Sequence, residues 1–311
     1  MREFDLDTLP PFRPRWPWVG GDLQTLRNSF VYRTPDFTPF PSERLILPLD
    51  DGTGDQLHAL IHHPRAQSPH PLVVLIHGLT GSEDSKNIET SALYFLNHGY
   101  SVMRLNMRGA GPSAPFCRQF YHAGRSADVA FAVGKIPDRL RARGIVLMGI
   151  SLGGNVLLKC LAESPDLADV VAAVAVSPPV DLKAAQLNIM RPRNAVYHWH
   201  LLRHMKESLI SPNARARIDE TDTVSRVRSV YEFDDLIVAP ANGFDSAEDY
   251  YHRSSSGSVL NRITTPTLII HPQNDPWVPY EALVERTQGL GKNVRIAAPH
   301  DGGHIGFHVG G

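Results

Sequence analysis

Six short, continuous apolar runs constrain the fold of this chain more than any other feature. They are PLVVLI at 71–76, SVMRLN at 101–106, GIVLMG at 144–149, VAAVAVS at 171–177, PTLIIH at 266–271 and NVRIAA at 293–298. Runs of this length suit strands that are covered on both faces, as in a parallel sheet. Segments of helical character lie between them at 87–97, 123–133 and 152–163. This alternation predicts an α/β fold with a mostly parallel, doubly wound sheet.

The N-terminal part of the chain differs from this pattern. Residues 1–42 are rich in proline and aromatic residues, which favours an arm packed on the body. The segments ERLILPL at 43–49 and QLHALIH at 56–62 alternate apolar and polar residues, and Asp51-Gly52 marks a turn between them. We therefore expect an antiparallel hairpin at the start of a single domain that covers residues 43–311.

One interval, about 182–263, is too long for a single crossover helix and predicts an inserted helical cap. Within it, the segment 194–210 has the spacing of an amphipathic helix. The predicted apolar face, which we expect to line a binding pocket as a lid, consists of Val196, Trp199, Leu202, Met205 and Leu209.

Charge and apolar content exclude several functions. The chain has 31 Lys and Arg residues against 32 Asp and Glu residues, so it lacks the positive field that concentrates nucleic acid. Its apolar stretches are far shorter than the roughly 20 residues that span a bilayer. The start has no apolar signal segment, and Cys117 and Cys160 cannot form a disulfide framework. We expect a cytoplasmic protein with no transmembrane segment and no nucleic-acid partner.

The sequence Gly149-Ile150-Ser151-Leu152-Gly153-Gly154 carries the strongest chemical signal. It follows an apolar strand directly and precedes a helical segment, which is the context of a G-x-S-x-G nucleophile elbow. Small neighbours let a strained serine project its hydroxyl at the tip of the sheet. The pattern predicts that Ser151 is a nucleophile.

An attacking serine creates an oxyanion, which backbone amides of two loops would stabilise. The first candidate donor is the amide of Leu152, directly after the nucleophile. The second is the amide of Leu79 in His77-Gly78-Leu79-Thr80-Gly81, after the strand at 71–76. His77 precedes Ser151, whereas the base comes last in such folds, so we interpret it as a residue that shapes the loop.

The same chain order predicts an acid after the serine. Asp275 lies in the turn 271–279 at the carboxyl end of a strand, the edge along which open α/β sheets build their sites. Asp234 and Asp235 are weaker candidates because they fall inside the predicted cap.

The base should follow the acid, in the loop 299–306. His304 is preferred because the neighbouring glycines give the loop freedom to approach the serine, and His300 is the alternative. Asp301, three positions before His304, is a nearby acidic competitor for the role of Asp275. Together these choices predict a triad of Ser151, Asp275 and His304.

Two further patterns resemble metal-binding or nucleotide-binding motifs, but neither is complete. His200 and His204 have the i, i+4 spacing of metal ligands, but no glutamate stands between them in the metalloprotease arrangement. The glycine-rich segment 108–113 lacks the phosphate-binding and dinucleotide-binding patterns, so we interpret it as a loop near the active site. The sequence predicts neither a metal nor a cofactor.

With these motifs in place, the chain resembles the YheT-like branch of the α/β-hydrolases, relatives of eukaryotic hydrolases that act on acylglycerols and medium-chain esters. The resemblance extends from about Trp16 to Gly306 and rests on these segments: Gly20–Leu26, His77–Ser82, Met107–Gly111, the Ser151 elbow, Glu232–Asp235, Gly243-Phe244, Tyr250-Tyr251, Asp275-Pro276 and Gly302–Phe307. It implies an α/β-hydrolase fold and the same triad. Asp22 stands where the family usually has histidine.

The resulting hypothesis is a serine hydrolase that cleaves carboxylic esters, with short- to medium-chain acyl esters or acylglycerols as substrates. One alternative is an acyltransferase that passes the acyl group to an alcohol, which product analysis with ethanol present would detect. The other is a non-catalytic protein that binds a hydrophobic ligand on the same fold. A complete Ser, Asp and His set argues against this last alternative.

Overall fold

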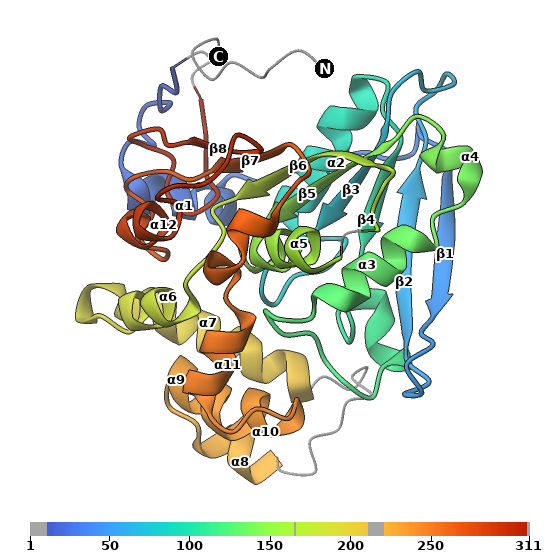
Figure 1. Ribbon diagram of the computed structural model, residues 1–311. Coiled ribbons are helices and arrows are strands. Elements are labelled where there is room, and N and C mark those ends of the chain that lie inside the picture. The colour runs from blue at the N-terminus through green and yellow to red at the C-terminus, as the bar shows by residue number, and fades with distance from the viewer. Residues whose placement is uncertain (1–10, 165, 211–220, 310–311) are drawn as a thin grey trace.

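The computed structural model describes residues 11–164, 166–210 and 221–309. An eight-stranded sheet forms its centre, in the order β1-β2-β4-β3-β5-β6-β7-β8 (Figure 1). The strands are β1 Ser42–Pro48, β2 Gln56–His62, β3 Leu72–Ile76, β4 Val102–Leu105, β5 Ile145–Ile150, β6 Val170–Val176, β7 Thr267–Ile270 and β8 Val294–Ala297. β2 pairs antiparallel with both β1 and β4, and the remaining neighbours are parallel.

Helices cover the sheet and fill the long interval between β6 and β7. They are α1 Gly21–Phe30, α2 Lys86–Asn97, α3 Ser126–Gly134, α4 Asp138–Arg141, α5 Leu152–Glu163, α6 Leu182–Ile189, α7 Ala195–Ile210, α8 Thr221–Arg226, α9 Val230–Phe233, α10 Ala239–Ala241, α11 Ala247–Ser254 and α12 Tyr280–Arg286. A π-helical turn, Asp234–Val238, joins α9 to α10. Short 3-10 turns occupy Gly111–Phe116, Pro192–Asn194, Ser256–Ser258 and Leu260–Arg262.

Strand β3 shows why the sheet is buried on both faces. Leu72, Val74 and Ile76 join one hydrophobic core, whereas Val73 and Leu75 join a second. The first core includes residues of α3 and α5, and the second includes residues of α2. Because successive residues of a strand point to opposite faces, both sets must be apolar. The continuous apolar run at 71–76 is the direct result.

The predicted fold class is confirmed. All six apolar runs form strands whose ends lie within one residue of the prediction, and the hairpin forms at 42–48 and 56–62. One element of the arm was not expected from the sequence: α1, over Gly21–Phe30, which has no side-chain cap at its N-terminus. The predicted division into an arm, a body and a cap remains a prediction.

The helices between β6 and β7 lie together at one end of the molecule, below the sheet in Figure 1. Their predicted lid face is wrong in part. Val196 and Trp199 are 75% and 60% exposed, whereas Leu202, Met205 and Leu209 are buried. α7 instead turns Tyr197 inward, where its hydroxyl donates to Asp22 Oδ1 (3.0 Å) in the arm. The contact with the arm therefore rotates the buried face of α7 away from Val196 and Trp199.

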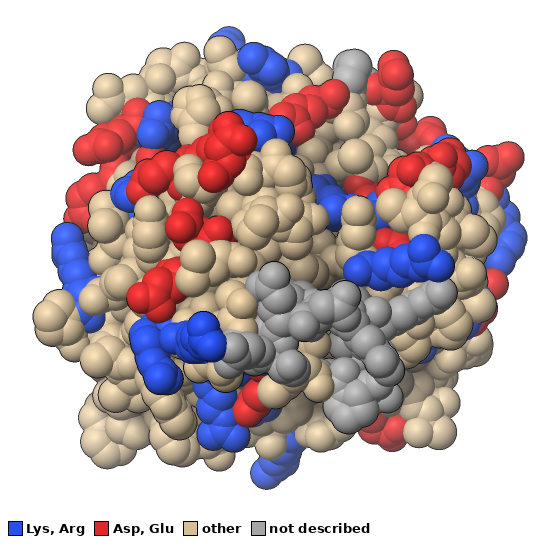
Figure 2. Space-filling model, turned by 90° about the horizontal axis from the view of Figure 1, so that it is seen from below, with Lys and Arg blue, Asp and Glu red and all other residues tan. Residues whose placement is uncertain are grey.

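The outer surface on the side of these helices carries both kinds of charge. Figure 2 shows basic and acidic side chains interspersed there, so the part of this face that the structure describes has no broad field of one sign. Among the described residues, none of the helices is both long and apolar enough to cross a bilayer.

Candidate active site

Ser151 occupies the sharp turn between β5 and α5. Its backbone has φ 53° and ψ −122°, a conformation that is strained for a residue with a side chain. The turn requires glycine two residues before and two residues after Ser151. A Cβ at Gly149 would lie 2.4 Å from the carbonyl oxygen of Gly153, and a Cβ at Gly153 would lie 2.3 Å from that of His77. These close approaches explain the two glycines of the sequence motif.

Ser151, His304 and Asp275 form a continuous chain of hydrogen bonds. His304 Nε2 lies 2.9 Å from Ser151 Oγ, and His304 Nδ1 lies 2.8 Å from Asp275 Oδ2. The carboxylate can only accept, so Nδ1 carries the proton and Nε2 is left to accept from the serine hydroxyl. Asp275 follows β7, and His304 follows β8, at the edge of the sheet where β5 ends in Ser151.

The surroundings of Asp275 keep its carboxyl ionised. Burial alone would raise its pKa, but the neighbouring His304, the ring of His271 and the amide of Val278 more than offset this, so the pKa lies below its usual value. Oδ1 accepts from the amides of Trp277 (2.8 Å) and Val278 (3.0 Å), which leaves Oδ2 for His304. The indole of Trp277 also stacks on the His304 ring, with centroids 4.6 Å apart.

The arm holds the histidine loop in place. Thr25 Oγ1 of α1 accepts from the His304 amide (2.8 Å) and donates to the carbonyl of Gly21 (2.7 Å). Four residues farther along the loop the chain returns to α1, since Gln24 Oε1 accepts from the amide of His308 (2.7 Å). No local pattern indicates these contacts, although the resemblance includes Gly20–Leu26. Asp22 binds Arg193 and Tyr197, so α1 also joins the helices between β6 and β7.

The loop after β3 approaches the serine from the other side. Among the described residues, the amides of Leu79 and Leu152 donate to no protein acceptor, so both N–H groups can donate to an oxyanion. His77 shapes this loop: it bonds the carbonyl of Gly78 through Nδ1 (2.8 Å) and accepts from the Met107 amide through Nε2 (3.1 Å). Burial lowers the pKa of His77 to about 4, so its ring is neutral.

A cavity of about 660 Å³ opens beside Ser151 and His304. Leu79 and Leu152 border it near the serine. Most of the other lining is apolar and comes from the loops after β3 and β4 and from the helices between β6 and β7, including Ala110, Phe120, Leu182, Ile189, Leu201, Met205, Leu209, Val230, Phe233 and Val238.

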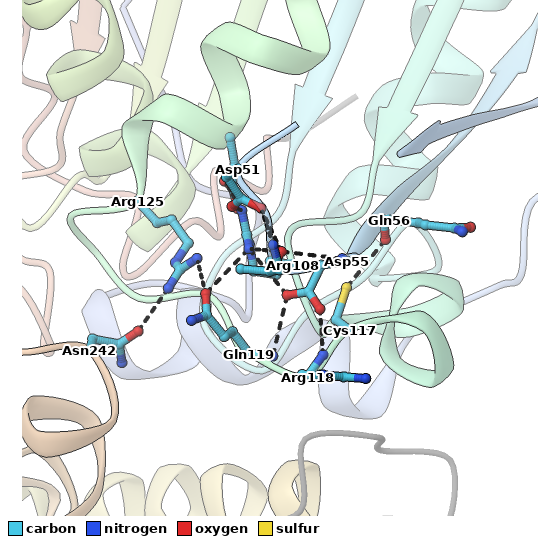
Figure 3. A network of polar contacts seen from close by, with 11 residues as sticks. Asp51, Asp55, Gln56, Arg108, Cys117, Arg118, Gln119, Arg125 and Asn242 are labelled. Atoms are coloured by element: carbon cyan, nitrogen blue, oxygen red, sulfur yellow. Dashed lines mark hydrogen bonds and ion pairs between the residues drawn. The ribbon is translucent and has the colours of Figure 1, made fainter. Parts of the chain in front are cut away.

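Arg108 anchors the glycine-rich loop that lines this cavity. Its buried guanidinium binds Asp51 and Asp55 of the hairpin turn (Figure 3). It also binds Asp128 of α3. Gly109, Ala110 and Gly111, the next residues, border the cavity. The arginine thus fixes the loop to the body of the domain, and Arg125 extends the same network to Asn242 in the helices between β6 and β7.

The competing candidates lie apart from the hydrogen-bonded chain. His300 is exposed, Asp301 accepts from the side chain of Asn274 (2.6 Å), and Asp235 accepts from the amide of Ala247 (2.8 Å). His204 bonds the carbonyl of His200 within α7. The described residues contain no cluster of three side chains that could hold a metal ion.

Known proteins share the sequence and the fold. The serine aminopeptidase S33 family matches residues 67–305. The putative esterase YheT of Escherichia coli K12 is 31% identical over 93% of this chain and 84% of its own length. The monoacylglycerol lipase of Saccharomyces cerevisiae is 26% identical over 76% of this chain and 55% of its own. The esterase Pf2001 of Pyrococcus furiosus, 18% identical, superposes with a TM-score of 0.58 over 88% of this chain and 90% of its own. This last likeness shows a common α/β-hydrolase fold.

Proposed function

Because the chain belongs to the serine aminopeptidase S33 family of α/β-hydrolases and is related to YheT, we propose that it hydrolyses carboxylic esters through an acyl-enzyme. One observation carries the proposal: the unbroken hydrogen bonds from Ser151 through His304 to Asp275, with Ser151 and His304 lining a mainly apolar cavity. This is the arrangement that converts a serine hydroxyl into a nucleophile. The names of the relatives, a putative esterase and a monoacylglycerol lipase, support an ester as the substrate.

The proposed reaction consists of two acyl transfers, first to Ser151 and then to water. Ser151 Oγ attacks the ester carbonyl carbon while its proton passes to His304 Nε2, and the charge on the carbonyl oxygen is stabilised by the amides of Leu79 and Leu152. His304 then protonates the departing alcohol, which leaves an acyl-Ser151 ester. A water molecule, deprotonated by His304, attacks this ester and releases the acid and the free serine. Asp275 keeps the proton on Nδ1 throughout, and no cofactor takes part.

The cavity suggests the substrate class. Its lining is mainly apolar, so it suits the acyl chain of a short- to medium-chain ester, and each buried methylene contributes up to about 0.8 kcal/mol. Leu201, Met205 and Leu209 supply the wall from α7. We propose that the helices between β6 and β7 act as a cap that separates this chain from water.

A covalent probe tests the nucleophile directly. A fluorophosphonate should label the wild-type protein, and Ser151→Ala should abolish the labelling, because only an activated serine reacts at a useful rate. The same pair should be compared on p-nitrophenyl esters of increasing chain length. Labelling of Ser151→Ala at the wild-type rate would reject Ser151 as the nucleophile. Ethyl esters formed with ethanol present would instead indicate acyl transfer.

A further inference from the structure

One wall of the cavity is polar. Four residues form it: His122, Asp234, Tyr250 and Tyr251, which we call the polar corner. They are contiguous, since the ring of His122 lies 5.8 Å from that of Tyr250, and the rings of Tyr250 and Tyr251 lie 5.4 Å apart. The mechanism proposed above uses none of them. A buried polar group that lacks a partner is costly, so this wall needs an explanation.

Among the residues of the polar corner, Asp234 has the side chain whose burial is least favourable for stability. Its side chain lies in the π-helical turn and only 7% of the residue is exposed. Oδ2 accepts from the Tyr251 hydroxyl (2.7 Å), and the described residues supply no ion pair with a cation and no hydrogen-bond donor to Oδ1. Burial raises the pKa of Asp234 to about 7, against the lowering effect of the bond from Tyr251. Asp234 therefore borders the cavity with one carboxyl oxygen that has no donor among the described residues.

His122 offers the complementary group. The amide of Gly124 donates to its Nδ1 (3.1 Å), so the proton of the neutral ring is on Nε2. Burial and the nearby Arg125 and Arg108 lower the pKa of His122 to about 3, so the ring stays neutral. No described residue accepts a hydrogen bond from Nε2. The polar corner thus combines an open acceptor on Asp234 with an open donor on His122.

Hydrogen bonds fix the polar corner relative to the nucleophile. The Tyr250 hydroxyl accepts from the Ala123 amide (3.1 Å). Asn155, one turn after Ser151 on α5, donates through its side-chain amide to the carbonyls of Ala123 (3.0 Å) and Ser254 (2.9 Å). The helix that carries the serine therefore holds two of the three segments of the corner, those of His122 and of Tyr250-Tyr251. A ligand group bound there would sit at a set distance from the ester.

We propose that the polar corner is a subsite for hydroxyl groups of the substrate, which can donate to Asp234 or accept from His122. This proposal rests on the ester hydrolysis proposed above. A hydroxyl is both donor and acceptor, so it can pair with either open group, and it pairs with Asp234 whether that carboxyl is ionised or neutral. An ammonium group fits less well, because it offers nothing to the donor of His122 and approaches Arg125.

The hydroxyl could belong to the alcohol or to the acyl part of the ester, and matched substrates separate these cases. For the alcohol, 2-hydroxyethyl octanoate is compared with propyl octanoate. For the acyl part, methyl 8-hydroxyoctanoate is compared with methyl nonanoate. A third ester, 2-aminoethyl octanoate, tests a cation. The measured quantity is the kcat/KM ratio of each substituted ester to its plain partner.

The ratio of one hydroxyl pair should fall at least tenfold in Asp234→Leu, the loss expected for a hydrogen bond to a charged group. Asp234→Asn, which keeps the size and a neutral hydrogen bond, should lower it about threefold to tenfold. If Asp234→Leu does not fold, Asp234→Asn alone tests the subsite. Asp235→Asn is the matched control, because Asp235 lies outside the cavity lining and accepts from the Ala247 amide. It should leave both ratios at the wild-type value.

The possible results divide clearly. If both hydroxyl ratios are unchanged in every folded Asp234 variant, the subsite is refuted while ester hydrolysis stands. The hydroxyl subsite is also refuted if the Asp234 variants change only the kcat/KM ratio of the aminoethyl ester, since the corner would then bind a cation. If Ser151→Ala still hydrolyses propyl octanoate at the wild-type rate, the proposed function fails and takes this subsite with it.

Discussion

Thr25 provides a test of how the arm supports the catalytic histidine. Thr25→Val keeps the shape of the side chain but removes the hydroxyl that accepts from the His304 amide at 2.8 Å. The amide then has no partner in a partly buried position, which should lower the free energy of unfolding by about 1–2 kcal/mol. The larger effect should be on rate. His304 must stay 2.9 Å from Ser151, and a displacement of about 1 Å can cost up to about 10²-fold.

We expect kcat for a p-nitrophenyl ester to fall at least tenfold in Thr25→Val, with KM near the wild-type value because Thr25 does not line the cavity. Thr25→Ser restores the hydroxyl and should recover most of the rate. Thr90→Val is the matched control: Thr90 also bonds the carbonyl four residues earlier, that of Lys86 (2.7 Å), but has no link to the site.

Urea unfolding should accompany the kinetics, so that the rate is referred to folded protein. A folded Thr25→Val protein whose kcat stays within twofold of wild type would refute the positioning role. A loss of stability without a loss of kcat would show that Thr25 only anchors the arm.

Three further predictions follow from the site. Asp275→Asn should lower kcat by about 10⁴, as the same change does in a serine protease, whereas Asp301→Asn should cost far less; the reverse order would refute the triad. Met205→Ala should weaken any preference of kcat/KM for longer acyl chains, and Trp199→Ala, on the exposed face of α7, should leave it unchanged; an effect confined to Trp199 would contradict this lining. Burial lowers the pKa of His77 to about 4, against about 6.5 when unfolded, so the unfolded state binds more protons in acid. The free energy of unfolding should therefore fall between about pH 6.5 and pH 4, by up to about 3 kcal/mol from His77, and urea titrations of His77→Gln should show a smaller fall.

The sequence predicted those features that local patterns determine. Each buried strand is a continuous apolar run, and the elbow needs glycines on both sides of Ser151, so both could be located from a few neighbouring residues. Helix α7 was located correctly, but its inward face was not. Its apolar residues could satisfy more than one face, and the hydrogen bond from Tyr197 to Asp22, across 175 positions of the chain, selects the face that is observed. A pattern within one helix cannot contain that contact.

Asp234 shows the same limit at the site itself. It is a weaker candidate acid in the sequence because it falls inside the predicted cap, yet it borders the same cavity as Ser151. A position inside this interval does not exclude a residue from the site, because the cavity is built from loops after β3 and β4 together with helices between β6 and β7. A carboxyl buried at 7% exposure without a cation beside it lowers stability, and no pattern of the core requires it. Positions that break a local rule in this way are where function is expected to outweigh stability, so the free oxygen of Asp234 is better explained by a ligand than by folding.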